Sequence, residues 1–353
     1  MTVTILVLII IAAGALYFYL KCNIMTAMTN LLAAVMGCIL AFSYYEQLAG
    51  LLASEKWAVT WIQSVAFLLI FFFGFLFIRV LSGFLAKSDF DVGRPAKLMI
   101  TIPIGILTGL FVSGALLIAA ALSPIPPKLF YCRFPLSQPL HLGITYPPII
   151  NADGFTVSFY SWVSRGSLSS TKSFAVLHAD YLTRLHLNRY ALGQGIPAVC
   201  SPKAVKLPMG NVQPVRLRDF SDQPKLVVIR IGISGNPIAK GGAEHENKIS
   251  FIPAQVALIM KEAEHAANLR GSASVVFPLG ILQNNELKTI NLHEPIVADA
   301  SSLGTDRTLW LDLVFSPHAE KQPVLLAFKQ NAIIGLPKPV LGSDEVEKAL
   351  GPL

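Results

Sequence analysis

Four long apolar segments in the first 122 residues constrain the fold of this chain more than any other feature. Each is about 18 to 25 residues long, the length that an α-helix needs to cross roughly 30 Å of hydrocarbon. None of them contains Lys, Arg, Asp, Glu or His. The sequence therefore predicts an integral membrane protein whose first domain, residues 1–123, is a bundle of four transmembrane helices. The segments are residues 3–20, 24–45, 57–78 and 98–122.

The first segment also has a second interpretation, because a secretory signal sequence is apolar too. A signal sequence begins with a positively charged region, whereas residues 1–4 carry no basic side chain. Three more apolar segments follow the first one. We therefore expect the first segment to be a helix that is retained in the mature protein.

Basic residues are concentrated in the link between the third and fourth segments. Short loops rich in Lys and Arg stay in the cytoplasm, and acidic residues have little effect on this preference. We therefore expect this link to be cytoplasmic, which places the tail that follows the fourth segment on the extracytoplasmic side. The residues that determine this topology are Arg79, Lys87, Arg94 and Lys97.

The fourth segment carries small residues at every fourth position, namely Gly105, Gly109 and Ser113. Residues with this spacing share one face of a helix, and small side chains on that face let a second helix approach closely in lipid. The face could pack against another helix of the same chain or join two copies of the chain. We favour packing within one bundle, because such motifs are frequent in helix bundles.

Few polar side chains lie inside the apolar segments, and none of them is ionisable. Pumps and ion-coupled transporters usually place charged groups in the membrane interior. The sequence therefore argues against an ion-coupled transporter made of one chain. An oligomeric channel stays open as an alternative function, with Asn30, Gln63 and Ser64 facing a shared pore.

The tail, residues 124–353, has the composition of a folded domain outside the membrane. It contains 22 Lys and Arg and 17 Asp and Glu, although only 14% of the whole chain is charged. The basic residues form no block and do not alternate with aromatic residues, so we do not expect nucleic acid as a partner. The tail is long enough for one large domain or two small ones.

Short stretches in the tail alternate between apolar and polar residues and are separated by Gly, Pro, Asn and Asp. This pattern predicts a mainly β, sandwich-like domain. One short helix is expected over 174–190, where leucines and a tyrosine share a helical face. A second helix near 256–269 competes with a strand, and 343–350 could form a helical turn. The expected strands are 156–159, 225–233, 249–260, 274–282, 309–315 and 324–328.

No catalytic or metal-binding motif stands out in the sequence of the tail. Residues 244–246 and Glu262, Glu264 and His265 match no zinc spacing, and no G-x-S-x-G elbow is present. We therefore expect no enzyme activity, no cofactor and no bound metal. Cys132 and Cys200 leave two alternatives, a disulfide worth about 4 kcal/mol or two buried thiols.

A series of features in the first 122 residues also suggests a family. A polar turn at 21–23 leads into a helix with small residues at 33–37. A Phe- and Leu-rich helix, 67–79, ends in a basic residue, and a basic loop precedes the glycines at 105 and 109. This order and spacing resemble the colicin V production protein (CvpA-like) family of membrane proteins.

The resemblance implies an inner-membrane protein linked to toxin production or export and to envelope homeostasis, and it implies no enzyme activity. The tail then looks like an added envelope domain of longer family members. We therefore expect four spans that anchor an outward-facing binding domain. The expected partners are the lipid bilayer, a membrane or envelope protein, and a second copy of the chain.

Overall fold

A computed structural model of the chain forms two compact units. The first contains residues 1–133 and 145–160, and the second contains 134–144 and 161–353. The expected boundary after residue 123 differs from this division, because residues 145–160 pack with the helices of the first unit. The structure describes residues 2–52, 61–85, 93–126, 131–135, 140, 142, 146–166, 171–208, 213–220, 223–284, 286–303, 306–318 and 320–341.

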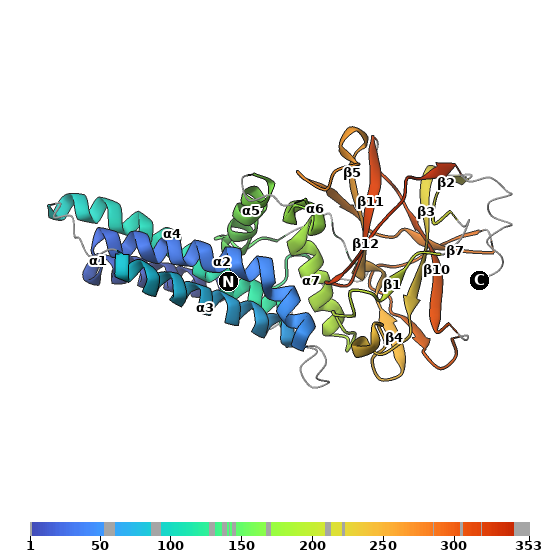
Figure 1. Cartoon of the computed structure of the whole chain (residues 1–353), viewed down its shortest axis with the longest axis horizontal. Coiled ribbons are helices and arrows are strands. Elements are labelled where there is room, and N and C mark those ends of the chain that lie inside the picture. Colours follow the sequence, from blue (N-terminus) through green and yellow to red (C-terminus); the bar gives the residue numbers. More distant parts are fainter. Residues whose placement is uncertain are drawn as a thin grey trace. The chain divides into compact units, whose positions relative to one another are not determined.

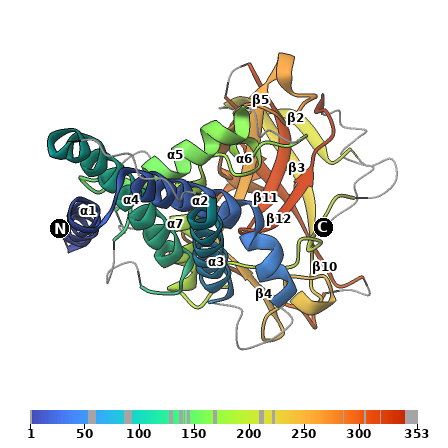
Figure 2. The same cartoon turned by 60° about the vertical axis from the view of Figure 1, so that its left-hand side comes forward.

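Four long apolar helices make up most of the first unit, which confirms the expected helical bundle (Figure 1). Helix α1 runs alongside α4, and α2 runs alongside α3 (Figure 2). With 29 residues each, α2 and α4 are about 43 Å long and exceed the roughly 30 Å of the hydrocarbon core. The helices are α1 (Thr2–Lys21), α2 (Ile24–Leu52), α3 (Ile62–Leu85) and α4 (Arg94–Leu122).

Helix α5 (Ala152–Arg165) occupies the region where the sequence predicted a strand over 156–159, so that prediction was wrong. Ala152, Thr156 and Tyr160 recur every four residues and are buried, the first two completely. They form the helix face that packs on the bundle. Apolar and polar residues alternate over 156–159, which is typical of a strand. The residues that are buried recur every four positions, however, and this spacing requires a helix.

The second unit is mainly β, as expected, and its core lies between two antiparallel-dominated sheets. The larger sheet has the order β13-β2-β3-β10-β7-β8, with β1 also paired to β3, and the smaller sheet has the order β12-β11-β5-β6. A separate pair joins β4 and β9. The strands of the larger sheet are β1 (Val205–Lys206), β2 (Val215–Phe220), β3 (Gln223–Ser234), β7 (Gly280–Gln283), β8 (Glu286–Thr289), β10 (Thr308–Phe315) and β13 (Val340–Leu341). The others are β4 (Lys248–Phe251), β5 (Val256–Glu262), β6 (Ser274–Val276), β9 (Ile296–Asp299), β11 (Lys321–Phe328) and β12 (Ala332–Gly335).

The predictions of strands at 225–233, 309–315 and 324–328 are confirmed by β3, β10 and β11. The expected strand 249–260 is divided into β4 and β5 by a short 3₁₀ helix, η2 (Pro253–Gln255), and 274–282 is divided into β6 and β7. The competing helix over 256–269 was wrong, because β5 pairs with β11 along its whole length. The predicted turn at 343–350 lies outside the described residues.

The single helix expected over 174–190 is two helices, α6 (Phe174–Leu177) and α7 (Tyr181–Leu192). They are separated at Asp180, whose φ of 49° is left-handed and cannot continue a helix. Val176 packs on the outer face of the smaller sheet. Helix α7 is fixed to η2, because the amide of Gln255 donates to Asn188 Oδ1 at 3.0 Å. The two helices therefore cover and anchor the smaller sheet.

A buried ion cluster joins three strands of the larger sheet. Asp312 lies directly opposite Arg230 in the β10–β3 register and accepts two hydrogen bonds of 2.8 Å from its guanidinium. Arg216, on β2, lies 3.2 Å from the same carboxylate. Side chains of Arg216 and Asp312 are 2% and 4% exposed, so the charges are removed from water and held by one another.

Candidate functional site

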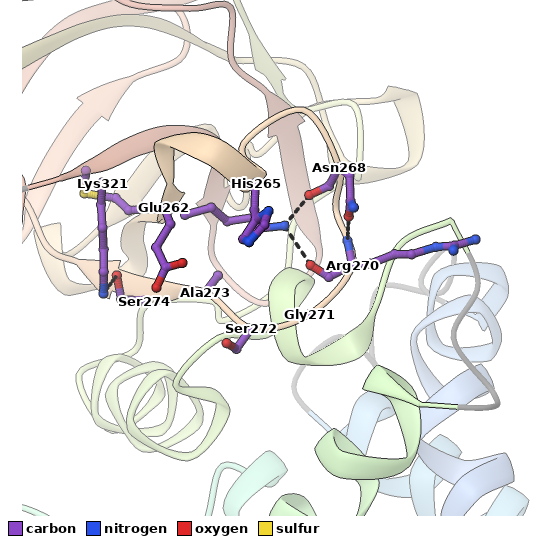
Figure 3. Close-up of a pocket in the computed structure, with 11 residues that line it drawn as sticks. Glu262, His265, Asn268, Arg270, Gly271, Ser272, Ala273, Ser274 and Lys321 are labelled. Carbon is purple, nitrogen blue, oxygen red and sulfur yellow. Dashed lines mark hydrogen bonds between the residues drawn. The ribbon is translucent and has the colours of Figure 1, made fainter.

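A pocket of about 400 Å³ opens at one end of the smaller sheet, where β5 ends and β6 and β11 begin (Figure 3). The loop between β5 and β6 forms one wall, and it includes a short 3₁₀ helix, η3 (Ala263–His265). The volume lies within the range of about 300–1,000 Å³ that is usual for small-ligand sites. The pocket is lined by Met260, Lys261, Glu262, His265, Asn268, Arg270, Gly271, Ser272, Ala273, Ser274 and Lys321.

Lys261 organises the loop wall of the pocket. Its side chain is buried, with 3% of the residue exposed, although it lies near the end of β5. The ammonium donates to the backbone carbonyl of Asn268 and, at 2.7 Å, to that of Arg270. The backbone N–H of Arg270 donates in turn to Asn268 Oδ1 at 2.6 Å. One cation therefore fixes the path of the loop.

The same loop is also tied to the chain before α6. The Ser173 hydroxyl donates to the carbonyl of Gly271 at 2.9 Å, and its N–H donates to the carbonyl of Leu269 at 2.9 Å. Gly271 has a φ of +84°, a left-handed conformation that glycine adopts without strain. The loop wall is therefore held from two sides, which preserves the shape of the pocket.

Burial lowers the pKa of the Lys261 ammonium, and the neighbouring charge of Glu262 opposes this effect. An ammonium has three N–H donors, and two of those of Lys261 point at loop carbonyls. The cation therefore lies at the pocket wall with one further donor.

A second cation comes from the opposite strand. Lys321 on β11 lies directly opposite Glu262 in the register, and its ammonium donates to the Ser274 hydroxyl of β6 at 3.1 Å. Figure 3 shows the carboxylate of Glu262 and the ring of His265 among these groups, whereas the guanidinium of Arg270 points away from them. Two ammonium groups, one carboxylate, one imidazole and serine hydroxyls thus line the pocket, with Lys261 and Lys321 on opposite faces of the sheet. This set favours a ligand that carries an acidic group.

The small residues singled out on the fourth apolar segment lie where α4 meets α1. A Cβ atom on Gly105 would lie 2.8 Å from the Cα of Ala15, and one on Gly109 would lie 2.8 Å from the Cα of Ile11. The Ser113 hydroxyl is buried and donates to the Gly109 carbonyl at 2.6 Å. This face is thus occupied by a helix of the same chain.

Three of the expected topology-determining residues are described. Arg79 lies in the last two turns of α3, and Arg94 and Lys97 lie in the first turn of α4. They therefore share one end of the bundle, as expected for residues that flank the link between the third and fourth apolar segments. Lys87 lies outside the described residues. Which side of the membrane this end faces stays a prediction.

The polar residues of the spans are buried within one chain. Asn30 and Gln63 are each 2% exposed, and Ser64 is 5% exposed. The Ser64 hydroxyl donates to the carbonyl of Ala119 at 2.7 Å. The Asn30 Oδ1 and both amide atoms of Gln63 have no hydrogen-bond partner among the described residues. These groups face neighbouring helices of the same bundle.

No disulfide joins Cys132 and Cys200 in this structure. Cys200 is buried beside Asn331, whose side-chain Oδ1 accepts from the Cys200 backbone N–H at 3.1 Å. Burial raises the pKa of the Cys200 thiol to about 12, and the charge of Lys329 opposes this shift. Cys132 is partly exposed, so two buried thiols do not describe the pair, and the disulfide stays a prediction.

Within the described part of the chain, no three His, Cys, Asp or Glu side chains converge as metal ligands. Of the candidates noted in the sequence, Glu262 and His265 do lie together, but as parts of the pocket described above. Sequence reasoning missed the pocket because its lysines come from two different strands. A signal was available, since Lys261 directly follows the apolar run 256–260 and a lysine there requires partners.

Comparison with protein family models, with curated proteins and with solved structures gives no match to this chain. The class of protein to which this chain belongs can therefore be argued only from its fold. Four helices long and apolar enough to cross a bilayer make it a multi-pass membrane protein. The second unit adds a mainly β domain with one basic pocket.

Proposed function

We propose that this chain is a membrane-anchored binding protein without enzyme activity, whose β domain holds an acidic group of a partner in the pocket beside Lys261 and Lys321. The observation that carries the proposal is the lining of the pocket, in which the Lys261 ammonium fixes the loop wall and the Lys321 ammonium lies beside the Ser274 hydroxyl. Cationic donors hold a carboxylate or phosphate more strongly than neutral donors do.

The strength of this site limits what it can bind. A hydrogen bond to a charged group contributes about 1.5–3 kcal/mol, so two ammonium groups alone hold a free anion only weakly. Glu262 offsets part of the positive charge. We therefore infer that the acidic group belongs to a larger partner, such as an envelope protein, which adds contacts outside the pocket.

The cellular setting is part of the same proposal. The basic end of the bundle formed by Arg79, Arg94 and Lys97 supports a cytoplasmic side there and an extracytoplasmic β domain. An inner-membrane location and a role in toxin export or envelope homeostasis follow only from the resemblance to the CvpA-like family. That resemblance stays a prediction, because no family model matches.

The alternative of an oligomeric channel draws less support. It requires Asn30, Gln63 and Ser64 to face a shared pore, but all three side chains are buried inside one bundle. Solute flux through proteoliposomes containing the full chain would contradict the binding proposal and favour the channel.

The binding proposal can be tested with the full chain in nanodiscs. Inorganic phosphate, citrate and a glutamate-rich peptide are the probes, and calorimetry measures their affinity for the wild type, Lys321→Gln and Lys240→Gln. Lys240 is an exposed lysine elsewhere in the β domain and serves as the matched control. We expect at least one probe to bind, with Lys321→Gln weakening it about tenfold or more, since 1.4 kcal/mol is a factor of ten.

Two results would contradict the proposal. One is that no acidic probe binds to the wild type even at about millimolar concentration, where two charge-assisted hydrogen bonds should hold a free anion. The other is that Lys321→Gln and Lys240→Gln bind the probe equally, because binding would then depend on the overall positive charge of the protein and not on the pocket. Lys261→Met is a poorer test, since it also frees the loop that Lys261 holds.

A further inference from the structure

Residues 145–160 pack with the apolar helices, although they follow the last span. Their depth can be read from the contacts of α4. Gly105 meets Ala15 and Gly109 meets Ile11, so α1 and α4 run antiparallel in a fixed register. Continuing this register places Val3 level with Leu117, and the two belong to one buried cluster.

The beginning of α1 marks one boundary of the hydrocarbon. Helix α1 has 20 residues and is about 30 Å long, which matches the hydrocarbon thickness. Its first turn therefore lies near the membrane surface, and Leu117 of α4 lies at the same level. Groups that contact α4 before Leu117 lie on the membrane side of this level.

Helix α5 makes its contacts on that side. A Cβ atom on Gly114 would lie 2.5 Å from the carbonyl oxygen of Ala152, so the two helices touch at this glycine. Phe111 packs against the rings of Phe155 and Phe159, with centroids 5.2 and 5.1 Å away. Phe111 is six residues before Leu117, or about 9 Å deeper.

Most of the side chains that this segment leaves exposed are apolar or aromatic, and the polar ones are Asn151 and Ser158. Ile149 is 90% exposed, Tyr146 58% and Phe155 38%. A pocket of about 530 Å³ lies between residues 146–149 and the first turns of α1, and Ile5 lines it while remaining 49% exposed. Ile5 of α1 and Ile149 therefore line the same pocket.

The charged side chain of the segment is paired, as lipid contact requires. Asp153 is completely buried, and it accepts hydrogen bonds from Arg133 at 2.8 and 3.2 Å and another from the Tyr131 hydroxyl. The Asn151 side chain accepts from the backbone N–H of Gly154 at 3.2 Å and so caps the start of α5. No charge of this group has to face lipid alone.

We propose that residues 146–160 are a fifth, non-spanning membrane element, which lies in the lipid at the membrane face where α1 begins. Lipid is its partner, because exposed apolar side chains of the segment line one pocket with those of a spanning helix. Tyr146 has the amphipathic ring that is enriched at membrane interfaces. Acyl chains fill the pocket between residues 146–149 and α1. This inference does not depend on the ligand of the β domain.

Spin labels in proteoliposomes of the full chain test this placement. A nitroxide is attached at Ile149→Cys, with Cys132 replaced by serine in every variant. Leu8→Cys, on the exposed surface of α1, gives the lipid reference, and Ser302→Cys, exposed in the β domain, gives the water reference. Power saturation measures how each label collides with oxygen and with a water-soluble nickel complex.

We expect the label at position 149 to resemble the one at position 8, with an oxygen-to-nickel ratio several-fold above that at position 302. A label at 149 that collides with nickel as freely as the label at 302 would overturn the proposal, since the segment would then lie in water. A label shielded from both reagents would also overturn it, because protein rather than lipid would cover the site.

Discussion

Replacing Gly109 by alanine should weaken the membrane bundle, although alanine is the better helix former. The added Cβ would lie 2.8 Å from the Cα of Ile11 and 3.3 Å from its Cγ1. Carbon atoms prefer separations of about 3.5–4.0 Å, so α1 must move away by roughly 0.7–1.2 Å. The nearest atom belongs to the backbone, and a change of rotamer cannot relieve the contact.

The expected size follows from two opposing effects. Overpacking of a filled site costs about 1–3 kcal/mol. Alanine in place of glycine stabilises a helix by about 1 kcal/mol. Gly109→Ala should therefore lower the free energy of unfolding by about 1 kcal/mol. Gly83→Ala is the control, because a Cβ on Gly83 meets nothing within 4 Å. Only the stabilisation from the higher helix propensity of alanine then remains.

Unfolding of the full chain in mild detergent, followed by circular dichroism during titration with a denaturing detergent, measures both variants. The two should shift in opposite directions, and their difference isolates the packing cost. Equal stabilisation by Gly109→Ala and Gly83→Ala would refute the close contact of α4 with α1. A change in oligomeric state without a change in stability would instead assign Gly109 to contacts between copies.

Three further predictions concern the β domain. Asp312→Asn should lower the free energy of unfolding by about 3–5 kcal/mol in denaturant titrations, because it leaves two buried arginines without their carboxylate. A loss below about 1 kcal/mol would count against the buried ion cluster. Burial lowers the pKa of Lys329 to about 8 from its usual 10.5, so between these values the unfolded chain binds more protons and stability rises with pH. Lys329→Met should thus have a free energy of unfolding up to about 3 kcal/mol above that of the wild type at pH 7, and this difference should disappear by pH 10.5. A difference that does not change with pH would contradict the lowered pKa of Lys329. A membrane-impermeant maleimide should modify Ser302→Cys, exposed in the β domain, in the folded protein but the buried Cys200 only after unfolding, so the sidedness of the tail can be read from position 302. Rapid labelling of Cys200 would show that it is accessible.

Labelling of Ser302→Cys, with Cys132 replaced by serine, also addresses the expected topology. If the basic end of the bundle faces the cytoplasm, position 302 should react in intact cells. Reaction only after permeabilisation would place the β domain in the cytoplasm, and the proposed binding to an envelope partner would then be wrong. The pocket chemistry of Lys261 and Lys321 would be unaffected by this result.

Much of the fold could be predicted because it depends on local patterns. The four helices follow from apolar length, since lipid offers no partner for an exposed backbone and forces each segment to satisfy its own hydrogen bonds. The strands β3, β10 and β11 follow from runs that are apolar on the core face. Errors arose where the pattern was short, as at 156–159.

The pocket could not be predicted, because its parts are distant in sequence. Lys261 and Lys321 are brought together only by the β5–β11 register, and Ser274 joins them through β6. Nothing near Lys261 in the sequence indicates that carbonyls seven and nine residues later will accept its hydrogen bonds. Long-range strand pairing decides this site.

The sequence by itself determined that the chain enters the membrane four times and ends in a β-rich domain. Both conclusions rest on periodicity and length, which act within a single element. Only the tertiary structure decided that α5 is a helix, that α1 covers the glycine face of α4, and that two lysines share a pocket. These features depend on which surfaces meet, and burial against a partner overrides the local preference of a short segment.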